Sequence, residues 1–553
     1  MALFAELRRR NVFKVALLFA VASWLVVWLL GDLQGRVSLP VWTETFVYFL
    51  IVVGFPLALL FAWTYEITPA GLKKADDVDQ TQSIVFKTGQ KLNAAVAVLL
   101  VLGALAVVGE RLLPTFEFLV PGVPEGEAPM ANTTPAEIRS LALDNGLKII
   151  VWPDHDIPNV VMYTFVRAGG RNEYPGITGV SHFFEHMMFL GTERRAPGEF
   201  DAEMEAAGGA NNAYTSSDVT VYEDWFPRSA LETIFELEGD RFENLAIVPD
   251  VFESERKVVY SERRSSIDNS NFRKLHEQVQ ATAYVAHPYQ FTVIGWPSDI
   301  EAWTQDDLVS YYRTYYAPNN RTVIVTGDVT SEEVFRLAEE HFGPAPAQEP
   351  PPAIRTVEPE QLGPRHLVVE ASAQTPLLHV AFHAAGAAAP ETLSMNLLLN
   401  ILVGGESSRL HQLFVEGEGL AISVGGYQDE GFDPGLAYFY LTLPPDGDPV
   451  ELERRILDEL TRVADEGVTD AELSKARNIV LADFWRELAT INGKASALGN
   501  YDVFHGNYEK LFRLPVEMKT ITAEDLRAVA AKVFRANNMT VGVLRAPAAK
   551  GPQ

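Results

Sequence analysis

Two histidines four residues apart, His182 and His186, stand in the stretch HFFEH (182–186). On a helix this spacing places both imidazoles on one face, about one turn apart, so both can reach one metal ion. Glu185, beside the second histidine, can face the same ion or a water molecule next to it. Two neutral nitrogen ligands with a carboxylate base beside them form the core of a hydrolytic zinc site. A helix that carries two histidines by chance is the alternative interpretation.

A third ligand is expected on a second helix, because catalytic zinc normally takes three protein ligands and a water molecule. The stretch FESERKVVYSERRSSIDN (252–269) is a candidate, since Glu255 and Glu262 are two helical turns apart and share a face. The arginines of the same stretch also fit a solvated, salt-bridged helix. The residues alone leave both interpretations open.

The composition excludes several classes of function. Acidic residues number 73 against 45 basic ones, for a net charge of −28, and the absence of a long basic run argues against nucleic-acid binding. The chain has no cysteine, so any zinc must be held by His, Asp or Glu. Its 553 residues suffice for roughly three to four domain-sized units.

Three apolar segments, at about 12–30, 46–63 and 93–109, predict transmembrane helices in an anchor covering 1–113. Basic residues before the first segment and between the second and third predict a cytoplasmic N-terminus. If all three segments span a bacterial inner membrane, the rest of the chain lies in the periplasm. If the third segment does not span, the rest of the chain lies in the cytoplasm. The N-terminal stretch resembles a bacterial membrane module that precedes unrelated soluble domains. Residues 114–137, rich in Pro, Glu, Ala and Thr, predict a flexible linker.

The elements around the motif alternate between strands and helices. We expect a strand, a turn at Asn145-Gly146 and a second strand within 143–154, another strand over 160–170, and a helix over 226–245. The proline-rich stretch 343–363 predicts an interdomain linker. Beyond it we expect strands within 366–386 and a helix over 394–414 that breaks at Gly404-Gly405. RANNMTVGVLRAP (535–547) echoes APNNRTVIVTGDV (317–329), which indicates a duplicated domain.

The sequence resembles the pitrilysin/insulinase family of inverzincins, which includes mitochondrial processing peptidase. The motifs that carry the resemblance are LDNGLKIIV (143–151), AGGRNEYPGITGVSHFFEHMMFLGT (168–192), GGANNAYTSSDVTVYED (208–224), the pair Glu255 and Glu262, HPYQFTVIGWPSDI (287–300) and YYAPNNRTVIVTGDV (315–329). It implies an α+β fold of two processing-peptidase-like (LuxS/insulinase-type) halves, 138–342 and 364–548, that form a clamshell.

The resemblance also implies roles for individual residues. His182, His186 and Glu262 would hold one zinc ion per chain, Glu185 would be the general base, and Glu255 would orient a ligand histidine. Asn212, Ala213 and Thr215 would lie along a strand that pairs with the substrate backbone.

The second half departs from the family pattern at two positions. Family members usually carry an Arg and, seven residues later, a Tyr that help to hold the substrate and the transition-state oxyanion. Val415 and Ile422 occupy these positions, and Tyr427 is out of register. We therefore predict a zinc endopeptidase for unfolded proteins or peptides, anchored in membrane lipid and completed by an Arg/Tyr-bearing subunit in a homo- or heterodimer. The alternative is a non-catalytic peptide-binding or scaffold subunit; no kinase, cyclase or nucleotide motif supports a signalling receptor.

Overall fold

The structure is a computed structural model that describes residues 135 and 137–547, together with a few positions before residue 75. The chain divides into two compact units, Met1–Ala128 and Pro129–Gln553. In the first unit, β1 (Tyr65–Thr68) and β2 (Gly71–Lys74) pair as antiparallel strands. Apart from single positions, the predicted membrane segments and the linker 114–137 lie outside the described residues. No helix within the described part is long and apolar enough to cross a membrane.

The first half of the second unit is built on a mixed sheet with strand order β3-β4-β8-β5-β7-β6. Its strands are β3 (Arg139–Ala142), β4 (Lys148–Pro153), β5 (Asn159–Val166), β6 (Ala210–Thr215), β7 (Thr220–Pro227) and β8 (Arg321–Gly327). Strands β4 and β8 run parallel, and the other neighbours are antiparallel. The predicted turn at Asn145-Gly146 is confirmed, although the strand before it ends at Ala142. Gly146 has a φ of 83°, a conformation that favours glycine.

The second half repeats this topology in a sheet with the order β9-β13-β10-β12-β11. Its strands are β9 (Arg365–Glu370), β10 (Leu377–His383), β11 (Ser423–Gln428), β12 (Leu436–Thr442) and β13 (Met539–Arg545). Strands β9 and β13 form the parallel pair, as β4 and β8 do in the first sheet. The two sheets therefore have the same topology, except that the first sheet has one additional edge strand, β3.

The predicted internal repeat is visible at the level of single hydrogen bonds. Asn320, just before β8, donates to the carbonyl of Tyr315 at 2.8 Å. Asn538, just before β13, donates to the carbonyl of Val533 at 2.9 Å. Both asparagines are buried and close the same turn between a helix and a strand. The duplication thus extends from strand order to side-chain contacts.

Helices fill the connections between these strands. In the first half they are α5 (Val180–Met187), α6 (Glu199–Ala206), α7 (Leu231–Glu243), α8 (Pro249–Arg263), α9 (Asn271–Ala283), α10 (Pro297–Ala302), α11 (Gln305–Tyr315) and α12 (Ser331–His341). In the second half they are α13 (Thr392–Val403), α14 (Pro449–Glu466), α15 (Asp470–Leu488), α16 (Ile491–His505), α17 (Leu514–Thr520) and α18 (Ala523–Val533). The predicted helix break at Gly404-Gly405 is confirmed, because α13 ends at Val403. The helix expected over 226–245 is α7, which begins only after β7 has ended.

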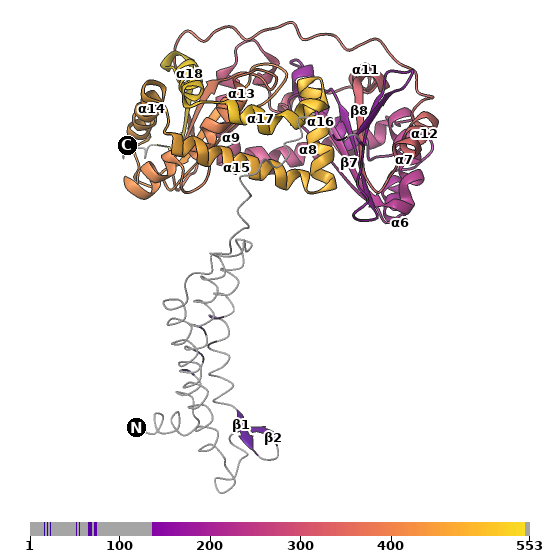
Figure 1. Ribbon diagram of the computed structural model, residues 1–553, viewed down its shortest axis with the longest axis horizontal. Coiled ribbons are helices and arrows are strands. Elements are labelled where there is room, and N and C mark those ends of the chain that lie inside the picture. Colours follow the sequence, from indigo (N-terminus) through magenta and orange to yellow (C-terminus); the bar gives the residue numbers. More distant parts are fainter. Residues whose placement is uncertain are drawn as a thin grey trace, which may run out of the picture. The chain divides into compact units, whose positions relative to one another are not determined.

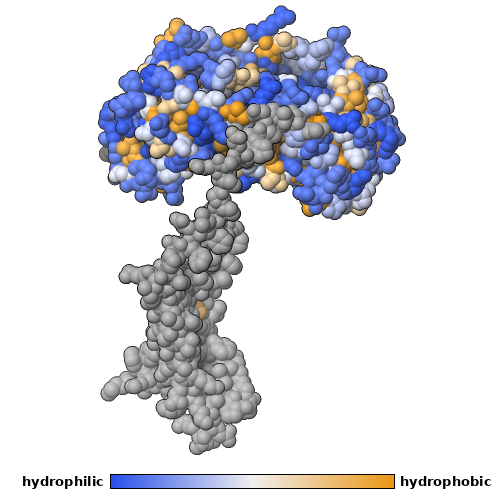
Figure 2. Space-filling model, viewed as in Figure 1, coloured by the Kyte–Doolittle hydropathy of each residue, from blue (hydrophilic) through white to orange (hydrophobic). Residues whose placement is uncertain are grey.

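Each half contributes a helix that packs on the sheet of the other half. Helix α9 of the first half packs on strands β9, β10 and β13, while α16 of the second half packs on β4, β5 and β8. Figure 1 shows α16 beside β8. Gly499 of α16 allows the closest approach, because a Cβ there would lie 2.0 Å from the ring of Phe165. Between the halves, residues 343–364 contain no helix or strand. The drawn face carries small apolar patches among mostly hydrophilic residues (Figure 2).

Candidate metal centre

Helix α5 carries the HFFEH stretch and buries one of its faces. Phe183 packs against the ring of Trp303 at 5.0 Å between centroids, and Phe184 stacks on Tyr311 at 5.4 Å. Burial of large aromatic side chains anchors a short helix strongly. The remaining face of α5 carries His182, Glu185 and His186, which are only partly buried.

A buried carboxylate holds the beginning of α5. Glu173 accepts hydrogen bonds from the backbone N–H groups of Gly179 at 2.7 Å and Ser181 at 2.8 Å. Acceptor oxygens at a helix N-terminus satisfy the N–H groups that the helix itself leaves free. Burial raises the pKa of Glu173 to about 8. The sequence interpretation assigned no role to Glu173, which lies six residues before the N-cap Gly179, too far for a local helix-start signal to identify it.

The predicted metal ligands meet at the exposed face of α5. The Nε2 atoms of His182 and His186 lie 3.7 and 3.4 Å from Oε2 of Glu262, and the three donor atoms fall within 4.8 Å of one another. Tetrahedral zinc with bonds of about 2.1 Å separates its ligands by roughly 3.4 Å. The donor set therefore fits zinc in both type and spacing. Within 137–547 it is the one group of at least three such side chains that could hold a metal ion.

Glu255 orients the second histidine from the same helix that carries Glu262. Its Oε1 atom lies 2.8 Å from Nδ1 of His186, which turns Nε2 toward the cluster. Burial disfavours charge on His186, but hydrogen bonds to Glu255 and Glu262 outweigh it and raise its pKa to about 9. Burial, followed by the neighbouring His186, lowers the pKa of His182 to about 4.

Glu185 faces the cluster without contributing one of these donor atoms. Its Oε2 atom accepts a hydrogen bond from the hydroxyl of Thr215 at 2.6 Å. Burial raises the pKa of Glu185, and the hydrogen bond opposes this shift. The carboxylate is thus fixed in position beside the donor set, as a general base requires. The family resemblance implies that Thr215 lies on a substrate strand, and only the structure shows its contact with Glu185.

The predicted substrate strand is β6, at the edge of the first sheet. Asn212, Ala213 and Thr215 all lie on it, but their side chains alternate between faces. Ala213 and Thr215 face α5, whereas Asn212 lies opposite Glu223 on the other face. The second side of β6 pairs with no described strand, so its backbone can accept an added strand. Contact of these residues with substrate stays a prediction.

The second half brings neither an arginine nor a tyrosine to the two family positions. Val415 lies in a helical turn (His411–Gly417) and packs against the core of its own half. Ile422 stands just before β11 and is 53% exposed. Tyr427 is on β11 itself and is also partly exposed.

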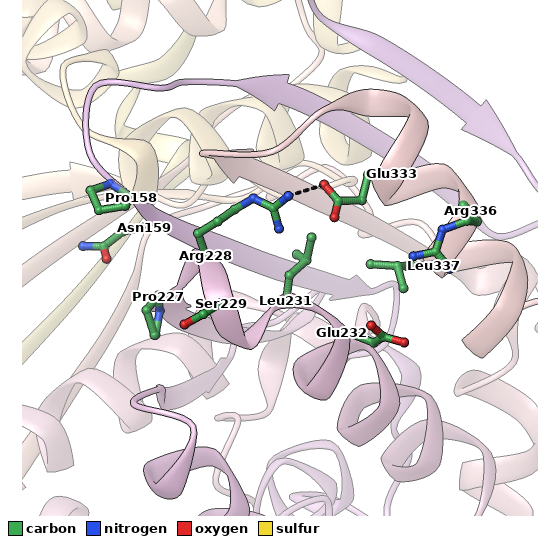
Figure 3. A pocket seen from close by; sticks show the side chains of 10 residues that line it. All are labelled: Pro158, Asn159, Pro227, Arg228, Ser229, Leu231, Glu232, Glu333, Arg336 and Leu337. Atoms are coloured by element: carbon green, nitrogen blue, oxygen red, sulfur yellow. Dashed lines mark hydrogen bonds and ion pairs between the residues drawn. The ribbon is translucent and has the colours of Figure 1, made fainter.

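A cavity of about 580 Å³ lies on another part of the first half (Figure 3). Arg228 and Glu333 form an ion pair of 2.5 Å across it, and Arg336 and Glu232 lie near its rim. None of the predicted metal ligands lines this cavity. The donor set instead lies at the meeting point of α5, β6 and α8.

Known proteins share both the sequence and the fold. Residues 151–295 match the family model described as insulinase (peptidase family M16), and residues 302–480 match the model of the peptidase M16 inactive domain. The chain is 30% identical to the zinc protease PqqE of Helicobacter pylori over 416 residues, which is 73% of this chain and 92% of that protein. It is 24% identical to the uncharacterised zinc protease YmxG of Bacillus subtilis over 401 residues, covering 72% and 96% of the two chains.

Solved structures with the same fold belong to proteins described as proteases. The crystal structure of a protease from Helicobacter pylori has a TM-score of 0.72 and 29% identity, covering 74% of this chain and 99% of that one. The periplasmic protease PqqL from Escherichia coli, at 18% identity and a TM-score of 0.63, shares the fold over 75% of this chain and 48% of its own length. The chain therefore belongs to the insulinase family, peptidase family M16.

Proposed function

We propose that this protein is a membrane-anchored zinc metalloendopeptidase that hydrolyses peptides or unfolded proteins. The observation that carries the proposal is the convergence of His182, His186 and Glu262 beside Glu185. Relatives named zinc proteases, which match most of the second unit, support the same class of activity.

The side chains divide the chemistry among them. Zinc held by the donor set would polarise the scissile carbonyl and lower the pKa of a water molecule. Glu185 takes the proton from that water and returns it to the leaving amine. Thr215 holds Oε2 of Glu185, and Glu255 holds Nδ1 of His186, so both groups keep their orientation through the reaction.

The free edge of β6 supports an extended substrate. A peptide that adds to this edge makes main-chain hydrogen bonds, which depend little on side-chain identity. Because Thr215 at the end of β6 contacts Glu185, such a peptide passes close to the base. A folded protein cannot offer an unpaired strand there, which favours unfolded segments as substrates.

The anchor and the location are part of the proposal. We place residues 1–113 in the bacterial inner membrane, in contact with lipid, and the peptidase unit in the periplasm, on the strength of the apolar segments and the basic residues that flank them. A periplasm-specific reporter fused after residue 120 should be active in cells. Activity of a cytoplasm-specific reporter at that point would contradict the topology.

A partner subunit would complete the substrate side of the site. Val415 and Ile422 support this, because neither can supply the charge or the hydroxyl that the family pattern has there. A heterodimer with an Arg/Tyr-bearing chain should show a higher kcat/KM than this chain alone, whereas a homodimer would bring Val415 and Ile422 twice. The same substitutions, with the match to an inactive-domain model, favour a second candidate function: a non-catalytic, peptide-binding subunit of such a complex.

Peptide hydrolysis separates the two candidates. The purified full chain, loaded with zinc in detergent, should cut an unfolded peptide, and Glu185→Gln should lower kcat by about 10²–10⁴-fold with its zinc content unchanged. Glu253→Gln is the matched control: Glu253 lies on α8, the helix of Glu262, but pairs with Arg256, so this variant should keep its activity. The peptidase proposal fails if the zinc-loaded wild type cuts nothing, either alone or with an Arg/Tyr-bearing partner.

A further inference from the structure

The inner face of the first sheet is left uncovered at one end. Helix α16 covers strands β4, β5 and β8 on this face, and it stops short of the edge strands. Trp225 of β7 lies opposite Val161 in the strand register and faces the same side of the sheet. Val161 is buried beneath α16, whereas Trp225 is 37% exposed. An indole ring is thus open to solvent beside the sheet edge.

A cavity of about 500 Å³ adjoins this ring. Ile157, between β4 and β5, and Pro227, the last residue of β7, form apolar walls. Thr490 and Asn492 from the start of α16 close the cavity from the second half. Asp154 and Asp156 also line it. Asp154 is paired with Lys494, but exposed Asp156 forms no ion pair with any residue of 137–547. The cavity therefore combines an aromatic face with one uncompensated negative charge.

The cavity can be reached from the free edge of β6. Ala210, the register partner of Trp225, is exposed and too small to screen the indole ring from a strand added at that edge. A long side chain on the added strand can therefore cross Ala210 and lie on Trp225. Thr215, which holds the base, is at the other end of β6, about 17 Å away at roughly 3.3 Å per residue.

We propose that this cavity is a subsite for an arginine or lysine side chain of the peptide substrate, about five residues away from the residue beside Thr215. A guanidinium or ammonium group over an indole face gains a cation–π attraction. The aliphatic stem crosses Ala210, and the charge faces Asp156, which lines the same cavity. This inference rests on the proposed peptidase function and adds a substrate class to it.

The side chain must be both long and positive to use all of these contacts. A leucine side chain is too short to reach across Ala210 to the indole and the carboxylate. A glutamate would meet Asp156 and Glu223 on the same face with like charge. We therefore expect selection for a basic residue at one position, remote from the scissile bond.

The test is a peptide series with one fixed cleavage site. Arginine, lysine, leucine or glutamate replaces alanine, one position at a time, up to seven residues on either side of the site. The zinc-loaded full chain should show a kcat/KM for arginine about tenfold above that for alanine at one position four to six residues from the bond. At this position leucine and glutamate should give a ratio below three.

Two variants locate the effect. Trp225→Ala and Asp156→Asn should each lower the arginine-to-alanine ratio at least threefold, and Asp156 lies in an exposed loop where the substitution leaves the fold intact. Trp485→Ala and Asp306→Asn, which replace exposed residues outside the cavity, are the matched controls and should keep the ratio. A wild-type ratio below three at every position, an equal ratio for leucine, or a ratio retained in either cavity variant overturns the subsite. If the wild type cuts none of the peptides, the peptidase function itself fails.

Discussion

The two halves of the peptidase unit have the same strand order but differ in the helix that follows their central strand. In the first half, α5 leads from β5 toward β6 and has two histidines and a glutamate on one face. In the second half, α13 occupies the corresponding place between β10 and β11, and its sequence, TLSMNLLLNILV, is mostly apolar and has no charged residue. Four of its leucines, Leu397, Leu398, Leu399 and Leu402, are buried in the core of that half.

This difference shows that the fold supplies a place for a metal site but does not create one. A helix at this position can be held by burying a single face, as Phe183 and Phe184 do in α5, which leaves a polar face for ligands. Alternatively, it can be buried nearly all round, as α13 is, and then it has no face on which charged groups would be tolerated. The comparison predicts that metal chemistry is confined to one half.

The largest expected effect is on metal content. Zinc analysis of the purified chain should give one ion per chain, and Glu262→Gln should lower the affinity for zinc at least tenfold and abolish hydrolysis, because a neutral amide is a poor zinc ligand. Glu487→Gln on α15, in the second half, should change neither quantity. A second tightly bound ion that survives the Glu262 substitution would break the comparison between the halves.

The hydroxyl of Thr215 should matter next, because it positions the base. Thr215→Val keeps the shape and the strand propensity but removes the donor to Glu185. We expect kcat to fall about tenfold or more with little change in KM, a size typical of a lost hydrogen bond to a charged group. Thr215→Ser should restore most of kcat. If valine and serine behave alike, the hydroxyl does not act on the base.

The repeated asparagines provide a matched pair of stability measurements. Asn320→Ala and Asn538→Ala each remove a buried amide from the same turn, and each should lower the free energy of unfolding by about 1–3 kcal/mol. Denaturant titration of the peptidase unit within the full chain measures both. Unequal losses, with one variant near zero, would show that the two turns are alike in geometry but not in energy.

The smallest effect concerns the contact where the halves meet near the end of β6. Asp218 accepts from the hydroxyl of Tyr289 at 2.7 Å and lies 3.3 Å from Arg171, which also pairs with Asp433 of the second half. Asp429, from the same loop as Asp433, lines a cavity with Asp218. Burial raises the pKa of Asp218 to about 6 and that of Asp429 to about 7.

These shifts predict a pH dependence of stability. Both carboxyls have a higher pKa in the folded chain than in the unfolded one, so folding favours their protonated forms. Their stabilising contribution is complete below about pH 4 and is lost as the pH rises through 6 and 7. Because of these two carboxyls, the melting temperature should fall as the pH rises from about 4 to 7, and Asp429→Asn should make this dependence shallower. An unchanged slope in the variant would rule out Asp429 as its source.

Much of the site could be predicted from short-range patterns. The spacing of His182 and His186, and that of Glu255 and Glu262, depends only on helical periodicity, and the structure places each pair on one helix face as expected. The turn at Asn145-Gly146, the break at Gly404-Gly405 and the echo of 317–329 in 535–547 are equally local signals. The echo alone predicts a duplicated domain, and the turn and the helix break are predicted without any information about packing.

Other features required the tertiary structure. The residues alone left α8 open as a merely solvated helix, and the donation of Thr215 to Glu185 joins a strand to a helix thirty positions away. The exchange of α9 and α16 between the sheets, and the opening beside Trp225, have no local signature. By itself, the sequence determined which side chains share a helix face and where the chain turns or a helix breaks, because backbone geometry repeats over a few residues. Which faces meet was decided only by the folded chain, because it depends on burying apolar surface between segments that are distant in sequence.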